Sequence, residues 1–153
     1  MNETAVAQTD AIAAGELAER GEVAAALRLY DRLIAEQKDD AELWLAKGLL
    51  LADRADFLGA QEALQRAREI APDDSRIPFH LGRMAGSFGR PLAAAGLLAG
   101  AHALDPTNDE IRITLADALL RLDWWQTAAA LVEPMAAGLP GWWASTRDPA
   151  LAR

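Results

Sequence analysis

The sequence lines up with itself when it is shifted by 34 residues. Alanine recurs four times at this spacing, and a second column of small residues and a column of bulky residues keep the same register. The three columns are Ala26, Ala60, Ala94 and Ala128; Ala14, Gly48, Gly82 and Ala116; and Tyr30, Leu64, Leu98 and Val132. Small residues let two helices approach closely, and bulky residues fill the space beside them. A regular period of this length predicts a repeat array instead of a single globular core.

The same register divides the chain into units, each long enough for two helices. The units are 7–40, 41–74, 75–108 and 109–142, which form one array over 1–142, and 143–153 is a C-terminal tail, either capping or disordered. We expect first helices near 8–20, 42–53, 76–87 and 110–121, and second helices near 23–36, 57–70, 91–104 and 125–137. Pro134 lies inside the last range, so that helix should kink or stop near Glu133. No strand pattern is present, and the sequence predicts an all-α fold.

At this point the chain resembles the tetratricopeptide repeat family, whose 34-residue unit is an antiparallel helix pair. The second unit carries the clearest match, with Trp44, Gly48, Leu51, Ala60, Leu64, Ala67 and Pro72 in the family's spacing. The first unit departs from the pattern at Lys38, where the family usually has proline. The resemblance implies a right-handed α-solenoid of antiparallel helix pairs, the TPR-like superhelix, here a short bacterial array of about four repeats. Such a fold says little about function.

Composition argues against several functions. The chain has 153 residues, with 15 Lys and Arg against 23 Asp and Glu, and its net charge of -8 argues against a nucleic-acid partner. It has no cysteine and only two histidines, His80 and His102, so we predict no metal and no cofactor. The sequence shows no phosphate-binding glycine loop and no nucleophile beside a base, so we also predict no enzymatic activity.

The expected location follows from two further features of the sequence. The N-terminal residues begin polar and acidic, without the basic region and apolar run of a secretion signal. The longest uncharged helical stretch, residues 91–104, is too short to span a bilayer. We therefore expect a cytoplasmic protein with no membrane span.

The resemblance implies that the first helices line a concave groove and that the second helices form the convex side. The residues expected to hold a partner segment in the groove are Leu45, Leu49, Arg76, Phe79, His80, Arg83, Ile113 and Asp117. Four of these are apolar and lie beside two arginines and a histidine, which suits a protein or peptide partner with apolar anchors and an acidic group. A simpler interpretation stays open, in which Arg83 and Asp117, one period apart, pair with each other and bind no ligand.

The second helices of the last two units are poor in charge. Residues 1–76 hold 9 basic and 16 acidic residues, net -7, whereas residues 77–153 hold 6 and 7, net -1. A helix that is apolar on all sides is normally buried, so we predict self-association, as a dimer, through this half. The expected face comprises Leu92, Gly96, Leu97, Gly100, Ala130 and Leu131, with Trp124, Trp125, Trp142 and Trp143. The last two tryptophans are alternatively a cap over the final helix pair.

The leading hypothesis is a non-catalytic protein–protein interaction module, a scaffold that binds a partner segment in its groove and self-associates. Two alternatives stay open. The chain is an accessory repeat domain or subunit of an enzyme such as a glycosyltransferase or methyltransferase, or it is a co-chaperone or assembly factor. The sequence favours the scaffold, because apolar surfaces are predicted and a catalytic constellation is not.

Overall fold

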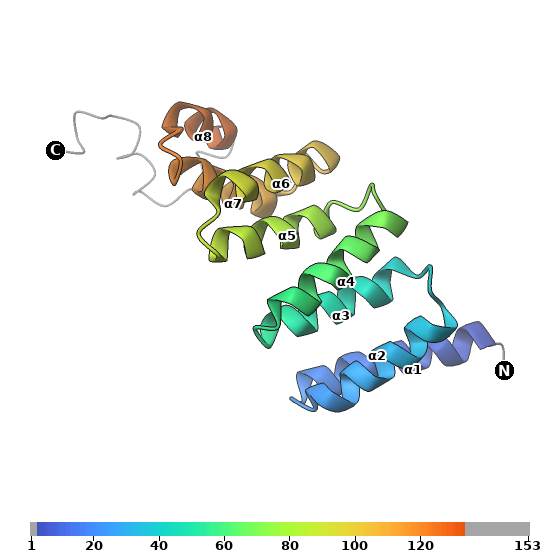
Figure 1. Cartoon of the computed structure of the whole chain (residues 1–153). Coiled ribbons are helices and arrows are strands. Elements are labelled where there is room, and N and C mark those ends of the chain that lie inside the picture. Colours follow the sequence, from blue (N-terminus) through green and yellow to red (C-terminus); the bar gives the residue numbers. More distant parts are fainter. Residues whose placement is uncertain (1–2, 134–153) are drawn as a thin grey trace. The chain divides into compact units, whose positions relative to one another are not determined.

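The computed structural model describes the backbone of residues 3–133 and the surroundings of side chains from residue 8 onward. This range contains eight helices and no strand (Figure 1). The helices are α1 (Glu3–Glu19), α2 (Val23–Glu36), α3 (Ala41–Asp53), α4 (Phe57–Ile70), α5 (Arg76–Ser87), α6 (Pro91–Leu104), α7 (Asp109–Leu120) and α8 (Trp125–Val132). The predicted all-α fold of antiparallel helix pairs is confirmed.

The predicted helix bounds agree with the structure for α2, α4, α5 and α6. Helix α1 begins at Glu3, before the expected start at residue 8, because no glycine or proline interrupts the residues in between. The kink expected at Pro134 lies outside the described residues. Two compact units divide between His80 and Leu81, within α5.

In the first unit, α1 packs against α2, α3 packs against α4, and α2 joins the two pairs by packing against α3. The pairs are joined by a core of buried residues from α1, α2 and α3: Ala14, Ala26, Tyr30, Leu33, Ile34, Leu43 and Leu50. In the second unit, α7 packs against both α6 and α8. Because consecutive helices reverse direction, α6 and α8 run parallel to each other on α7.

The repeated columns of small and bulky residues form the contact inside each pair. Gly48 of α3 lies against Leu64 of α4, and Gly82 of α5 lies against Leu98 of α6. A Cβ atom on these glycines would lie 2.9 Å and 2.7 Å from the respective leucine Cγ atoms. All members of the three columns are buried. The paired helices therefore approach each other at their small residues, and a bulky residue closes over each contact.

The turn inside each pair repeats with the same period. Gly21, Ala55, Gly89 and Asp123 have φ angles of 79°, 61°, 66° and 60°. The N–H of the following residue donates in each case to the carbonyl oxygen five residues earlier, over 2.8 to 3.0 Å. This is the Schellman ending of a helix, whose positive φ favours glycine. Ala55 and Asp123 adopt the same positive φ, although they are not glycine, because the register of the two helices requires a turn of this kind.

The next helix in the array begins with a side-chain cap, again at a fixed spacing. Asp40 accepts hydrogen bonds from the N–H groups of Glu42 and Leu43, and Asn108 accepts from those of Glu110 and Ile111. Asp74, midway between them in the sequence, accepts from the N–H of Arg76 at 2.9 Å. Asp40, Asp74 and Asn108 therefore satisfy N–H groups of the first turn that have no partner within the helix.

Replacing Gly82 with alanine tests the close approach of α5 and α6. The new methyl group would lie 2.7 Å from the Cγ atom of Leu98, a side chain that is only 1% exposed, and would crowd it. Overpacking costs about 1–3 kcal/mol, more than the gain of about 1 kcal/mol in helix propensity. Gly86→Ala in the same helix is the matched control, because its methyl group would meet only Ala94 at 3.8 Å. We expect Gly82→Ala to lower and Gly86→Ala to raise the thermal midpoint measured by circular dichroism; a rise in both contradicts this packing.

Replacing Ala55 with glycine should stabilise the first unit. At φ 61° the Cβ of alanine destabilises the folded state by about 1 kcal/mol, and glycine has no Cβ. Asp123→Gly should gain less, since aspartate tolerates this conformation better than alanine does. Ala71→Gly, at φ -124°, is the control and should not stabilise. The free energies of unfolding in urea measure all three, and equal effects at Ala55 and Ala71 are incompatible with strain in the turn.

Candidate interaction surfaces

Arg76, the first charged residue of the predicted groove, is tied to two carboxylates of the first unit. Its guanidinium donates to Asp74 at 2.6 Å and pairs with the carboxylate of Glu42 on α3. The hydrogen bonds from Arg76 hold the pKa of the Asp74 carboxyl below its usual range. Asp74 and Glu42 in turn raise the pKa of Arg76 above that of a free guanidinium. Arg76 thus joins α3 to the first turn of α5.

Fewer apolar side chains of the predicted groove are exposed in the first unit than the sequence predicts. Leu45 and Phe79 are only 4% and 6% exposed, and Leu49 is half-buried. The half-buried ring of His80 lies edge-on to Phe79, with 5.2 Å between the ring centroids. Leu45 is buried because α3 packs against helices on both of its sides, α2 and α4. The interpretation of Leu45 and Phe79 as exposed anchors is therefore corrected, whereas Ile113 on α7 is exposed.

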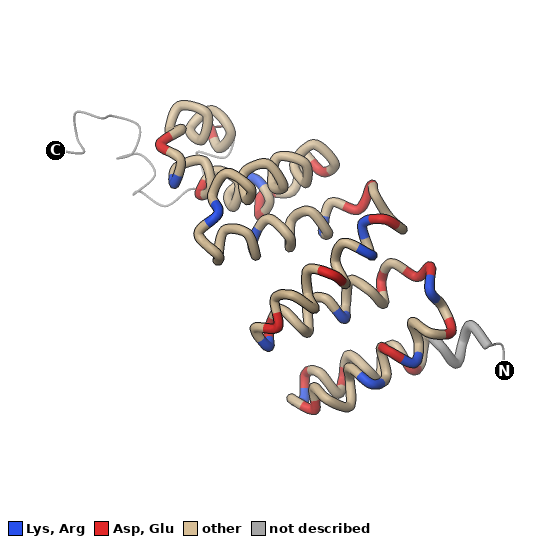
Figure 2. Tube along the Cα trace, viewed as in Figure 1, with Lys and Arg blue, Asp and Glu red and all other residues tan. Residues whose placement is uncertain are grey.

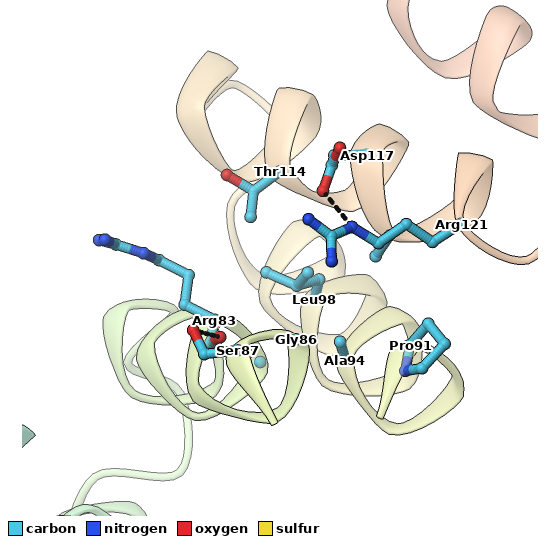
Figure 3. A pocket seen from close by; sticks show the side chains of 11 residues that line it. Arg83, Gly86, Ser87, Pro91, Ala94, Leu98, Thr114, Asp117 and Arg121 are labelled. Atoms are coloured by element: carbon cyan, nitrogen blue, oxygen red, sulfur yellow. Dashed lines mark hydrogen bonds and ion pairs between the residues drawn. The ribbon is translucent and has the colours of Figure 1, made fainter. Parts of the chain in front are cut away.

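In the second unit, α5, α6 and α7 enclose a pocket of about 250 Å³, which we call the α5–α7 pocket (Figure 3). Its apolar part consists of small residues and one leucine: Gly82, Gly86, Pro91, Ala94, Leu98 and Ala118. Five polar residues complete the lining: Arg83, Ser87, Thr114, Asp117 and Arg121. Two residues of the predicted groove, Arg83 and Asp117, thus lie at one pocket.

The polar groups of the α5–α7 pocket leave acceptors and donors for a ligand. The Ser87 hydroxyl donates to its own helix at 3.1 Å and the Thr114 hydroxyl does so at 2.7 Å, so both oxygens keep lone pairs that can accept. Asp117 accepts from the Nε of Arg121 at 3.0 Å. The terminal nitrogens of Arg121 lie above Leu98, and Arg83 extends away from Asp117 (Figure 3). The ion pair between Asp117 and Arg121 therefore joins α7 to its own C-cap residue.

A larger hollow of about 560 Å³ lies between α6 and α8, over α7, and we call it the α6–α8 groove. Four of its lining residues come from α6, two from α7 and four from α8 and the residue before it. They are Leu92, Ala95, Gly96 and Ala99; Leu115 and Leu119; and Trp124, Thr127, Ala130 and Leu131. None of these residues carries a charge. The groove is therefore an apolar surface on the second unit.

Large apolar side chains around the α6–α8 groove face the solvent. Leu92 is 65% exposed, Trp124 is 52% exposed and Trp125 is 40% exposed. Both α6 and α8 lack charged residues along their whole length (Figure 2). Extended apolar surface of this kind is typical of an interaction site.

Part of the predicted self-association face coincides with this groove. Leu92, Gly96, Trp124, Ala130 and Leu131 line it. The other predicted residues that the structure describes do not line it: Leu97 is half-buried, and Gly100 and Trp125 are exposed on the same helices. Trp142 and Trp143 lie outside the described residues.

Sequence reasoning missed five lining residues. Ala95, Ala99 and Thr127 follow the predicted residues at helical spacing, so a complete helical projection would have included them. Leu115 and Leu119 belong to α7 and form the base of the groove. The spacing of these two leucines is that of residues on the buried face of a helix. A leucine at the bottom of a groove and a leucine in a closed core follow the same spacing, so the sequence does not distinguish them.

No helix in the described range has the length and apolar character needed to cross a membrane. Residues 3–133 contain no group of three or more His, Asp or Glu side chains placed to hold a metal ion.

Comparison with known families agrees with the columns and turns of the fold. The family model for the tetratricopeptide repeat matches residues 87–144. Residues 87–144 therefore carry the sequence pattern of the tetratricopeptide repeat (TPR) family. The same 34-residue columns and Schellman turns extend the TPR pattern through α1–α4. No curated protein matches the sequence.

Several solved structures share the TPR fold at low sequence identity. MamA from Desulfovibrio magneticus RS-1 is 20% identical, with a TM-score of 0.74 over 86% of this chain and 74% of MamA. PilF from Pseudomonas aeruginosa is 20% identical, with a TM-score of 0.79 over 88% of this chain and 61% of PilF. The O-GlcNAc transferase of Thermobaculum terrenum is 24% identical, with a TM-score of 0.69 over 78% of this chain and 23% of the transferase. At these identities the likeness establishes the fold alone.

Proposed function

We propose that this TPR chain is a non-catalytic protein-interaction scaffold with two binding surfaces. The α6–α8 groove binds a second copy of the chain, and the α5–α7 pocket binds a segment of a partner protein. The observation that carries the proposal is the α6–α8 groove, where exposed apolar side chains surround a hollow of about 560 Å³ without one charged residue. Burial of such surface against another protein is worth about 25 cal/mol per Å².

A second copy is the occupant that the charge distribution favours. Residues 1–76 carry 9 basic and 16 acidic residues, net -7, and residues 77–153 carry 6 and 7, net -1. Two copies that met through their first units would bring like charges together, whereas the α6–α8 groove brings none. No charge has to be desolvated on either side of that contact.

Replacing Leu92 with glutamate should abolish self-association. Leu92 is exposed, so the fold tolerates the change, but a carboxylate would be buried without a partner in the dimer. Leu58→Glu is the matched control, because Leu58 is exposed at the equivalent position of α4, 34 residues earlier. Size exclusion with light scattering should give a mass near twice 16.4 kDa for the wild type and Leu58→Glu, and near 16.4 kDa for Leu92→Glu. A wild-type monomer throughout a concentration series refutes self-association.

The α5–α7 pocket fits a partner segment that combines an acidic side chain with small apolar neighbours. Arg121 donates to Asp117 through its Nε, so its terminal nitrogens can donate to an acidic side chain of the partner. The free lone pairs of Ser87 and Thr114 can accept hydrogen bonds from peptide N–H groups. The part of the pocket around Ala94 and Gly86 is apolar, so in a volume of about 250 Å³ it can take a small apolar side chain of the partner.

Arg121→Glu should weaken binding of acidic peptides at least tenfold, because a charge-assisted hydrogen bond contributes about 1.5–3 kcal/mol. The probes are an array of peptides with Asp or Glu between alanines, and the same peptides with Lys in place of the acidic residue serve for comparison. Fluorescence polarisation then measures the Kd of the peptide that binds best. Arg28→Glu, an exposed residue of α2, changes the net charge equally and is the control. An equal loss in both variants assigns the effect to overall charge, and a lack of acidic preference in the array refutes the ligand chemistry.

A further inference from the structure

We infer that the two copies dock antiparallel, with α6 on α6 and α8 on α8, so that Trp124 of each copy fills the small-residue section of the other copy's α6–α8 groove. The inference rests on the proposed self-association through this groove and specifies its geometry. It follows from the order of large and small residues along the two helices that form the groove walls.

The α6–α8 groove has a large end and a small end. Leu92 is the second residue of α6 and Trp124 immediately precedes α8, and since α6 and α8 run parallel, both large side chains lie at the same end. Gly96 and Ala99 follow Leu92 by about 6 Å and about 10 Å along α6, and Ala130 follows Trp124 by about 9 Å along α8. The space around Gly96 is open, since apart from its own stretch of helix no heavy atom lies within 4 Å of a Cβ built there.

The base of the α6–α8 groove is similar at the large end and at the small end, so the residues of its walls determine which side chains fit at each end. Leu115 and Leu119 of α7 line the groove from below and are buried. Leu131 is the one large wall residue at the small end, and it is half-buried. The open volume at this end is therefore bordered mainly by Gly96, Ala99 and Ala130, which leave room for an indole ring.

Only one of the two symmetric ways to place two copies face to face fills this volume. If the two-fold axis runs along the helices, α6 faces α8 of the other copy, and Leu92 meets Trp124 while the small ends face each other across a void. If the axis crosses the helices, α6 lies antiparallel on α6, and each large end meets a small end. A void forfeits dispersion contacts, so the second arrangement packs better. Both arrangements are isologous and close as dimers, so the packing decides between them.

The expected dimer is reversible. Helix α6 is about 21 Å long and α8 about 12 Å long, so a face built on these two helices buries an area at the low end for specific complexes. A single well-packed tryptophan contributes much of the affinity in such a contact. Trp124 has this role because it lines the groove, whereas the neighbouring Trp125 is exposed without lining it.

Trp124→Ala should weaken dimerisation at least tenfold in Kd by sedimentation equilibrium, and Trp125→Ala should leave the Kd within a factor of two. Trp124 is the N-cap residue of α8 but makes no side-chain capping bond, so its truncation does not remove a cap. If Trp125→Ala weakens the dimer as much as Trp124→Ala does, Trp124 is not the residue that fills the groove and the inference is overturned.

Single cysteines test the orientation directly, because the chain has no cysteine of its own. In the antiparallel dimer Gly96 lies near the two-fold axis, so Gly96→Cys should cross-link to itself with a short bismaleimide, and Leu92→Cys should cross-link to Ala99→Cys in a mixture but not to itself. Glu62→Cys, at the position of α4 equivalent to Gly96, is the background control.

The outcomes separate the geometry from the proposed function. Cross-linking between Leu92→Cys and Trp124→Cys, with none for Gly96→Cys, shows the parallel arrangement and overturns this inference while self-association stands. A wild-type protein that is monomeric by light scattering and shows no cross-link above the Glu62→Cys background overturns both.

Discussion

The close approach of paired helices at small residues is the contact on which the rest of the structure depends. At Gly82 and Leu98 there is no room for even one additional methyl group without movement of the leucine. The same contact recurs at Gly48 and Leu64, so α3 and α4 approach each other as α5 and α6 do. This packing leaves other faces of α6 and α8 free to differ, and the α6–α8 groove lies on those faces.

The fold was predictable because its determinants repeat. A column of identical or similar residues at a 34-residue spacing marks equivalent positions without any knowledge of the structure, and it also located the turns. Ala55 and Asp123 show the strength of this signal. Neither residue type favours a positive φ as glycine does, yet both adopt it because they occupy the register of Gly21 and Gly89. The period therefore predicted their place in the turn, although their identities did not predict their conformation.

The surfaces were predicted less well, because equivalence between repeats does not tell which side of a helix remains open. Leu45 was placed in the groove by register, but α3 is packed between α2 and α4 and buries this side chain. One interpretation of the sequence paired Asp117 with Arg83, one period away, whereas in the structure Asp117 accepts a hydrogen bond from Arg121, four residues later in the sequence. The uncharged face of α6 and α8 was predictable, since the absence of charge over a whole helix does not depend on which side is open.

The two units use the same architecture with different surface chemistry. In the first unit, charged side chains on neighbouring helices pair with each other, as Arg76 does with Glu42 and Lys47 does with Asp31. Such exposed pairs add little stability, but they keep the surface hydrated and unsuited to association. In the second unit α6 and α8 carry no charge. The surface between them consists of Leu92, Trp124 and small residues in place of charged side chains. Since the buried columns are alike in both units, this difference is not needed for folding, and we attribute it to binding.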